Sequence, residues 1–341
     1  GGRPVHSGEA PYGSSAGTSA GHKGWKRTRL FSLPGSAFVK VSEGCDNRCA
    51  FCAIPMIRGN MRSRNVADVL EEIKGLRDRG IFEMNLVAQD LASFGRDRRR
   101  GSDDPDALRR LMDGIVSMPG EFWVRPLYIY PEHFPDWLLE LCAYDSRVLP
   151  YFDIPMQHAD RSVLSSMGRP GSYERYLELV HRIRSMLPEA SIRTSMLVGY
   201  PAETERAFET LQRFQAEARI DWLGVFAFSA EEGTAAYARF GEEGPDRDLV
   251  LARADEIKRA QMEITTERLG RFVDKDEDVL IEEVIPGEDL YLARGRMHAP
   301  EVDGSIVLRH DEGAAKPGDV VRARIIRVNG VDLEATYVAR S

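Results

Sequence analysis

The sequence predicts an α/β protein: an open, partial parallel βα barrel of about six units, followed by a small antiparallel β-barrel. Two observations predict this fold. Between residues 36 and 240, six short apolar segments alternate with segments of helical periodicity. After residue 270, five short strand-like segments are separated by turns that include Pro-Gly and Asn-Gly. A complete eightfold barrel needs about 250 residues, so we expect the first part to remain open.

The first part repeats the pattern of a strand followed by a helix. Helices are predicted notably over residues 172–187 and 203–218, and Asn65 is the expected N-cap of an earlier helix. A long exposed helix is predicted over residues 246–268. Right-handed βαβ units make the sheet parallel, and ligands bind at the carboxyl ends of its strands. The predicted strands cover residues 37–41, 83–88, 122–128, 151–154, 191–198 and 222–228.

The second part consists of short strands and turns, which predict a small closed barrel. We therefore divide the chain into three regions. Residues 1–35, rich in Gly, Ser, Ala and Pro, form a flexible linker; residues 36–268 form the partial barrel, and residues 269–341 the β-barrel. The strands predicted for the β-barrel cover residues 278–284, 290–294, 304–308, 320–326 and 333–337.

The composition narrows the class of protein. Hydrophobic residues make up 43% of the chain, but no run of about 18 apolar residues occurs, so we expect no membrane partner. No secretory signal pattern is visible and cysteines are few, which predicts a cytoplasmic protein. The net charge of −8 makes nucleic acid a less favoured partner.

Three of the four cysteines, Cys45, Cys49 and Cys52, lie within eight residues. Thiolates are soft ligands that suit iron–sulfur clusters or zinc. A four-iron cluster normally takes four thiolates, so three leave one iron open to a small molecule. Zinc remains the alternative, although no histidine lies close to this segment. Cys142 lies in an apolar helical pattern and is expected to be an inert core thiol.

The Cys-x3-Cys-x2-Cys spacing with Phe51 resembles the signature of the radical S-adenosylmethionine (SAM) enzymes, and the run that follows resembles their methylthiotransferase family. The resemblance implies that Cys45, Cys49 and Cys52 hold a 4Fe-4S cluster and that S-adenosyl-L-methionine chelates its free iron. A reducing electron donor is implied as a partner. Phe51 and Ile54 are assigned to the cofactor, and the C-terminal barrel resembles a TRAM domain. The protein then orients and shields the cofactor.

Residues at the ends of the predicted strands are further candidates for cofactor binding. Gln89 follows the second strand and Gln157 the fourth, while Arg193 lies on the fifth and Gly199 ends it. Arg193 either clamps a carboxylate or forms a buried ion pair. Gly199 either lets a ligand approach the backbone or serves a simple turn. His158 is interpreted as a structural histidine rather than a proton carrier, and the catalytic residues stay unknown.

Two groups of methylthiotransferases compete as the nearest resemblance. One modifies an adenosine in transfer RNA, and the other, the RimO type, modifies the β-carbon of an aspartate in the small-subunit ribosomal protein S-twelve. Residues 130–132, 155–158, 167–172 and 299–304 resemble the RimO type. The resemblance therefore favours this ribosomal protein as the partner, with the transfer-RNA enzyme as the alternative.

Charge gives an independent reason for the same preference. Residues 269–341 contain ten Lys or Arg and fifteen Asp or Glu, a net charge of −5. An acidic barrel repels RNA and attracts a basic protein. We therefore expect charge reversal at Glu301 or Asp303 to slow association with the ribosomal protein.

The start of the chain also matters for the resemblance. Methylthiotransferases hold a second 4Fe-4S cluster with three cysteines of an N-terminal domain, and this chain has no cysteine before Cys45. We therefore expect the chain to lack the sulfur-donor domain and to be incomplete for full turnover. The further alternative is a substrate-binding fragment without complete catalysis.

Overall fold

The computed structural model describes residues 30, 32–97, 101, 103–241, 245–309 and 315–338. Most of the flexible linker predicted over residues 1–35 therefore lies outside the described residues. Within the described ranges, no helix is long and apolar enough to cross a membrane.

Six parallel strands follow one another in sequence order, as predicted. They form two three-stranded sheets with the orders β1-β4-β5 and β6-β7-β8. The sheets adjoin, because the Leu149 amide donates to the Val124 carbonyl at 2.9 Å and the Ile129 amide to the Asp153 carbonyl at 2.8 Å. The result is an open parallel barrel. Its strands are β1 (Ser36–Lys40), β4 (Glu83–Val87), β5 (Trp123–Pro126), β6 (Tyr151–Asp153), β7 (Ser191–Val198) and β8 (Trp222–Ala227).

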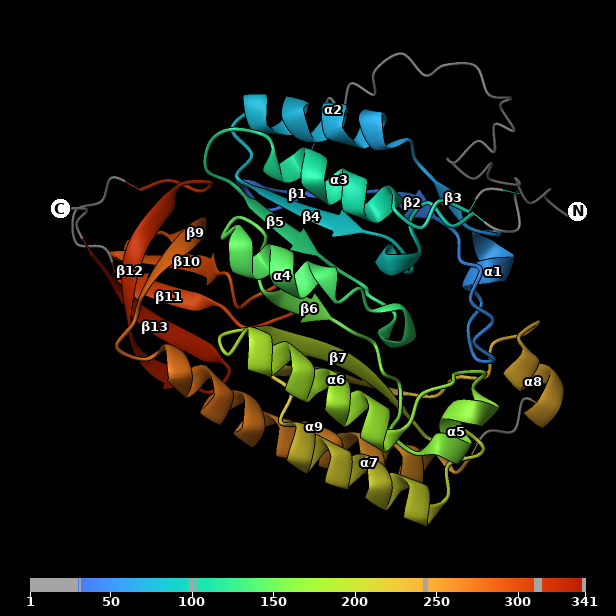
Figure 1. The fold of residues 1–341 in the computed structure, drawn as a ribbon. Helices are drawn as coiled ribbons and strands as arrows, with labels where there is room; N and C mark the ends of the chain where they lie inside the picture. Colours follow the sequence, from blue (N-terminus) through green and yellow to red (C-terminus); the bar gives the residue numbers. More distant parts are fainter. Residues whose placement is uncertain are drawn as a thin grey trace, which may run out of the picture.

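Helices cover the outer face of this open barrel (Figure 1). The apolar side of each strand and the buried stripe of each helix form one continuous core, which excludes water from the outer face of the sheet. The helices on this face are α2 (Val66–Asp78), α3 (Ala107–Val116), α4 (Trp137–Tyr144), α6 (Tyr173–Met186) and α7 (Glu205–Ala218). The shorter α5 (Arg161–Ser166) and α8 (Ala235–Phe240) lie at one end of the sheet instead. Short 3-10 turns are η1 (Leu91–Ser93), η3 (Pro131–His133) and η4 (Gly270–Phe272).

The long helix predicted over residues 246–268 is present as α9 (Arg247–Leu269), but the expectation that it is exposed was wrong. Val250, Ala254 and Ile257 are buried at helical spacing, and the helix packs against β8 and α7. The side-chain amide of Gln215, in α7, also donates to the Ile257 carbonyl at 2.9 Å. The helix therefore closes the sheet beyond β8 instead of standing in solvent.

The C-terminal strands form a closed five-stranded barrel in the order β10-β11-β13-β12-β9. The prediction of an all-antiparallel barrel is wrong for one pair, because β11 and β13 are parallel. The β12–β13 hairpin fills the gap between β9 and β11, and its second strand meets β11 in the same direction. The strands are β9 (Asp276–Ile285), β10 (Leu290–Gly295), β11 (Ile306–Arg309), β12 (Val320–Asn329) and β13 (Asp332–Tyr337).

The C-terminal barrel packs against the amino ends of the six parallel strands (Figure 1). Trp123, Tyr151 and Trp222, from the start of β5, β6 and β8, share an apolar cluster with barrel residues such as Met297. The Trp222 indole donates to the Met297 carbonyl at 2.8 Å. The opposite, carboxyl end of the sheet is therefore left free for a site.

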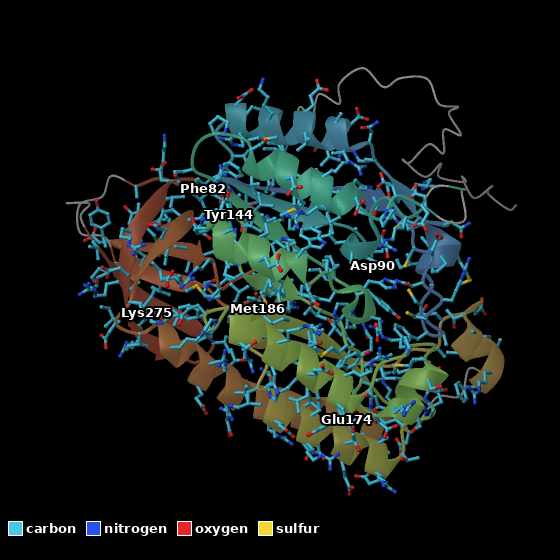
Figure 2. All side chains as sticks on the ribbon, viewed as in Figure 1. Phe82, Asp90, Tyr144, Glu174, Met186 and Lys275 are labelled. Carbon is cyan, nitrogen blue, oxygen red and sulfur yellow. The ribbon has the colours of Figure 1, made fainter. Side chains whose placement is uncertain are left out.

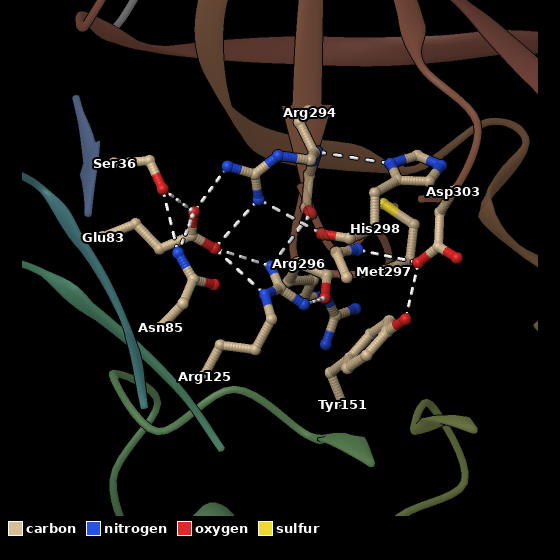
Figure 3. Close-up of polar contacts among 12 residues, drawn as sticks. Ser36, Glu83, Asn85, Arg125, Tyr151, Arg294, Arg296, Met297, His298 and Asp303 are labelled. Atoms are coloured by element: carbon tan, nitrogen blue, oxygen red, sulfur yellow. Dashed lines mark hydrogen bonds and ion pairs between the residues drawn. The ribbon is translucent and has the colours of Figure 1, made fainter. Parts of the chain in front are cut away.

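Buried charges reinforce this junction (Figure 3). The Glu83 carboxylate of β4 accepts from Arg294 of β10 at 2.9 and 2.5 Å and from Arg125 of β5 at 3.0 Å. Ser36 of β1 donates to the same carboxylate at 2.9 Å. Burial alone raises the pKa of Glu83, but Arg294 and Arg125 lower it to about 2. Glu83 is therefore a permanent anion that joins three strands of the sheet to the C-terminal barrel.

Candidate functional site

The cysteine loop, residues 44–53, lies at the carboxyl end of the sheet, between β2 (Ser42–Glu43) and α1 (Ile54–Ile57). β2 pairs with β3 (Arg62–Ser63), so the whole excursion is closed at its base like a hairpin. The Cys45 amide donates to the Gly59 carbonyl at 3.2 Å, and the Met61 amide donates to Asp46 Oδ1 at 3.2 Å. The start of the loop is thus fixed by backbone contacts.

The other end of the cysteine loop is held by segments far away in the chain. The Ala50 amide donates to the Met167 carbonyl at 2.8 Å, and the Ala236 amide donates to the Ala50 carbonyl at 2.8 Å. Gly168, with a φ of 73°, allows this approach, since a Cβ there would lie 3.0 Å from the Arg48 carbonyl oxygen. The loop is therefore clamped between the turn after α5 and the start of α8.

The three thiols lie partly buried and near enough to interact electrostatically. Burial raises the pKa of Cys45 to about 11, with a further contribution from Asp90. Burial also raises the pKa of Cys52. Backbone amides of Asn47 and Ile54 oppose these shifts by hydrogen bonding to Cys45 and Cys52. Without a bound cation the Cys45 and Cys52 thiols stay protonated near neutral pH, so binding a positively charged metal centre is coupled to proton release.

Cys49 differs from the other two because side chains contact its sulfur. The Tyr130 hydroxyl lies 3.9 Å from Cys49 Sγ, and Arg169 Nη1 lies 3.8 Å from it. The Arg169 guanidinium stacks on the Tyr130 ring at 4.1 Å from its centroid. A hydroxyl from the turn after β5 and a guanidinium from the turn after α5 therefore converge on one thiol.

A cavity of about 670 Å³ opens beside Cys45. Asp90, which follows β4, lines this cavity. Its carboxylate accepts hydrogen bonds from Ser93 at 2.6 Å, His133 at 2.9 Å and Asn47 at 3.1 Å. Figure 2 places Asp90 at the end of the sheet away from the C-terminal barrel and Lys275. Burial alone raises the pKa of Asp90, but hydrogen bonds from His133 and Ser93 lower it overall. The cavity wall thus carries a fixed negative charge, which suits a cationic or hydrogen-bond-donating ligand group.

The residues predicted from the strand ends are only partly brought together. Phe51 packs against the main core beside the cysteines, and Ile54 is half-buried at the start of α1. Gln89 is exposed after β4, next to the buried Asp90. Gln157 has a φ of 71° and forms a β-bridge with β7. Its backbone N–H donates to the Ser195 carbonyl at 2.8 Å. For these four residues, cofactor binding stays a prediction.

Arg193 and Gly199 have structural partners in the described part of the chain. Arg193 Nη1 lies 2.7 Å from Asp303 Oδ1 of the C-terminal barrel, which is the ion-pair alternative. Gly199 has a φ of 73°, and a Cβ there would lie 2.3 Å from Val250 of α9. Its lack of a side chain therefore serves helix packing. A cofactor role for either residue stays a prediction.

The two other candidates weighed from the sequence are structural. His158 is fully buried; its Nδ1 accepts from the Asp160 amide at 2.9 Å, and its Nε2 lies 3.2 Å from Glu203. Cys142 is buried in α4, and burial raises the pKa of its thiol to about 12. Both observations agree with the interpretations made from the sequence.

Sequence reasoning missed the roles of His133, Tyr130 and Arg169, and that of Glu132, whose carboxylate lies 3.7 Å from Arg169 Nη2. Residues 130–132 and 167–172 were noted only as segments that resemble one group of enzymes. A signal for Tyr130 and Glu132 was nevertheless present, since both follow a strand at the edge where ligands bind. Arg169 follows a short helix and carried no such signal.

The chemistry of the donor set fits an iron–sulfur cluster, because thiolates are soft ligands that suit one. A multi-iron cluster is ligated by cysteines at separate irons, and three neighbouring free thiols with nearby hydrogen-bond donors suit it.

Comparisons with known proteins agree with this geometry. The sequence pattern of the Radical SAM superfamily matches residues 39–214, and that of the TRAM domain matches residues 273–338. A relative from Treponema denticola, the ribosomal protein uS12 methylthiotransferase RimO, is 40% identical over 92% of this chain and 72% of its own length. This chain belongs to the RimO family of radical SAM methylthiotransferases. Its classification as an enzyme and the TRAM barrel predicted from the sequence are confirmed.

Other RimO proteins match a similar share of this chain. The relative from Thermotoga maritima is 40% identical over 92% of this chain and 70% of its own length. The relative from Myxococcus xanthus is 39% identical over 92% of this chain and 64% of its own length. Among solved structures, the radical SAM methyltransferase TsrM from Kitasatospora setae superposes with a TM-score of 0.48 at 17% identity, over 58% of this chain and 35% of that chain. The superfamily implies a 4Fe-4S cluster and SAM as cofactors.

Proposed function

We propose that this chain carries the radical step of an enzyme that methylthiolates an aspartate of ribosomal protein uS12, the S-twelve protein of the small subunit, in the cytoplasm. The observation that carries the proposal is the 40% identity to RimO, which extends over 92% of the chain. Cys45, Cys49 and Cys52 would hold the 4Fe-4S cluster, and the cavity beside Cys45 would take part of SAM or of the substrate. When bound, the cluster and SAM supply the one-electron chemistry.

The chain's own residues then have definite tasks in this proposal. The backbone clamps at Cys45 and Ala50 fix the loop before any cofactor binds, so little conformational entropy is lost on binding. Asp90 offers a negative charge to an ammonium group at the cavity wall. The packing of Phe51 against the core shields one side of the thiols from water. A second cluster and a sulfur-donor domain stay predictions.

The position of the C-terminal barrel limits how it could recognise uS12. The cysteine loop and the barrel lie at opposite ends of the sheet, separated by strands such as β7, whose eight residues span about 26 Å. A peptide needs about eight extended residues to span this distance, since a chain advances at most about 3.3–3.6 Å per residue. A whole ribosomal protein is large enough to contact the acidic barrel while its aspartate lies at the cysteine loop.

The structure also corrects one expectation about that barrel. The Asp303 side chain is fully buried and pairs with Arg193, so it cannot be an exposed steering charge. Glu301 is exposed and remains a candidate. Several other acids of the barrel are paired with arginines, which reduces the field they present to a partner. These paired acids are Asp276, Glu277, Asp278, Glu282 and Glu334.

The test is transfer of hydrogen from the substrate. The reconstituted chain is reduced and incubated with SAM and with uS12 that carries deuterium on the aspartate β-carbon. We expect deuterium in the 5′-deoxyadenosine product, and none with Cys49→Ala, which cannot hold the cluster. The readout does not need a sulfur donor. Deuterium transfer from labelled transfer RNA but not from uS12 would refute the proposal in favour of the transfer-RNA enzyme.

A further inference from the structure

The three cysteines of the proposed cluster site have unequal surroundings. Cys45 and Cys52 accept hydrogen bonds from backbone amides. Cys49 is approached instead by a guanidinium and a phenol, Arg169 Nη1 at 3.8 Å and the Tyr130 hydroxyl at 3.9 Å. A side-chain cation therefore lies against one particular ligand.

Arg169 is held rigidly in this position. Arg169 is only 4% exposed. Its Nη2 donates to the Pro155 carbonyl at 2.8 Å, and its guanidinium stacks on the Tyr130 ring. Glu132 Oε2 lies 3.7 Å from Arg169 Nη2, too far for a direct hydrogen bond. The carboxylate accepts instead from the Tyr176 hydroxyl at 2.8 Å through its other oxygen. The cation is thus only partly neutralised.

We propose that Arg169, assisted by Tyr130, sets the reduction potential of the cluster through the Cys49 thiolate. The inference rests on the proposed function, because it requires a cluster at Cys45, Cys49 and Cys52. Arg169 is a positioning residue in this role, since it acts on the cluster through Cys49.

The physical reason is the charge that reduction adds. One electron makes the cluster more negative by one unit, and a buried cation nearby stabilises that form more than the oxidised form. Donors to a ligating sulfur act in the same direction, since hydrogen bonds and net charge set cluster potentials. Arg169 and Tyr130 therefore raise the potential and make the cluster easier to reduce.

Glu132 supplies a test of opposite sign. Its carboxylate lies beside Arg169 and offsets part of the positive charge near Cys49. Replacing Glu132 with Gln should therefore raise the potential, whereas replacing Arg169 with Met should lower it. A general loss of packing cannot produce shifts in both directions.

The experiment uses the full chain, reconstituted anaerobically with iron and sulfide and titrated with dithionite while electron paramagnetic resonance follows the reduced cluster. We expect Arg169→Met to lower the midpoint potential, so that the ratio of reduced to oxidised cluster at a fixed poise falls about tenfold, equivalent to about 59 mV for one electron. Arg169→Lys should recover part of the shift because it keeps the charge. Tyr130→Phe should give a smaller decrease, since it removes one neutral donor.

Arg147→Met is the matched control. Arg147 also stacks on an aromatic ring, that of Phe122 at 4.8 Å, and donates to backbone carbonyls, but it lies beside the first residues of β5, at the sheet end away from the cysteines. The cluster in Arg147→Met should have the same midpoint potential as the cluster in the unmodified chain. Iron content distinguishes the proposed function from the proposed role of Arg169. If no protein binds about four irons, the unmodified chain included, the result counts against the proposed function.

Two results would overturn the inference itself. The first is a full iron content in Arg169→Met with an unchanged potential. The second applies if Arg169→Met does not fold: unchanged potentials in Arg169→Lys, Tyr130→Phe and Glu132→Gln together.

Discussion

Gly44, at the start of the cysteine loop, faces Gly59, which follows α1. Both have positive φ, 79° and 75°. A Cβ on Gly44 would lie 2.4 Å from the Asn60 carbonyl oxygen, whereas the nearest atom to a Cβ on Gly59 is Arg62 Nη1 at 3.9 Å. The backbone conformation is therefore equally restrictive at both positions, but only Gly44 also needs the space.

Gly44→Ala should destabilise the chain more than Gly59→Ala and should also reduce iron uptake. Both substitutions carry the left-handed backbone cost of about 1–2 kcal/mol, and Gly44→Ala adds a clash with backbone that cannot move cheaply. Urea denaturation and iron content measure the two effects. Equal losses in the two variants would show that close approach at Gly44 is unimportant.

Asp153, at the end of β6, is a buried carboxylate in an unusual setting. Burial raises its pKa, and although Arg193 opposes the rise, Asp303 adds to it, giving a value of about 7. Asp303, whose pKa is also raised mainly by burial, shares the same Arg193. Two carboxylates thus compete for one guanidinium, and Tyr151 and Tyr128 complete the surroundings.

The raised pKa of Asp153 predicts a pH dependence of stability. The folded state keeps the proton up to about pH 7, whereas the unfolded chain loses it near pH 3.8. The contribution of protonated Asp153 to the free energy of unfolding is present in full below about pH 4 and is lost as pH rises through about 7. The loss is at most about 4 kcal/mol. Asp153→Asn should flatten this decline in the free energy of unfolding between about pH 4 and 7, measured in urea. Asp113→Asn, an exposed control, should retain it.

Among the elements, α2 shows how local sequence signals determine a helix. Asn65 was predicted as its N-cap, and the Asn65 side chain accepts from the Ala67 amide at 2.9 Å. Val69, Ile73 and Leu76 are buried at the predicted helical spacing. The helix begins directly after β3, which closes the base of the excursion that holds the cysteine loop. The N-cap of α2 therefore fixes the chain where it leaves β3.

Asn65→Ala should lower the free energy of unfolding by about 1 kcal/mol, because an amide of the first turn loses its acceptor. Asp106 at the start of α3 is the matched control. It occupies the same cap position but makes no side-chain cap hydrogen bond, so Asp106→Ala should have little effect. Thermal or urea unfolding of the two variants decides the matter; equal effects would contradict the assignment.

At the scale of the whole molecule, Glu83 and its arginines join the open barrel to the C-terminal barrel. Glu83 and Arg125 are completely buried, and Arg294 is nearly so. Removing one partner leaves buried charge uncompensated, which is more costly than the pair is stabilising. The two parts should therefore unfold together only while this cluster is intact.

Glu83→Gln should destabilise the chain by about 3–5 kcal/mol and separate one unfolding transition into two. The matched control is Glu334→Gln, which breaks an exposed pair with Arg327 and should change stability little. Because the pKa of Glu83 is lowered to about 2, its contribution is present above about pH 4.5 and is lost as pH falls toward 2. Calorimetry at pH 7 measures both variants, and a single unshifted transition in Glu83→Gln contradicts the prediction.

The sequence by itself determined the features that depend on short spacings. Cys45, Cys49 and Cys52 share one loop because only six residues lie between the first and the last, and no packing is needed to bring them together. The six parallel strands and the five-stranded barrel follow from periodicity and turns, which are local properties of the chain. The resemblance to the methylthiotransferases rests on the same kind of local motif.

Only the tertiary structure decided which distant side chains meet. Arg169 reaches Cys49 across 120 residues, and Arg193 finds Asp303 across 110. Periodicity reports which face of an element is buried but not what packs against it, so neither pairing was visible in the sequence. The location of the C-terminal barrel at the amino ends of the strands depends on buried charges from both parts. Those charges can be recognised as partners only after the chain has folded around them.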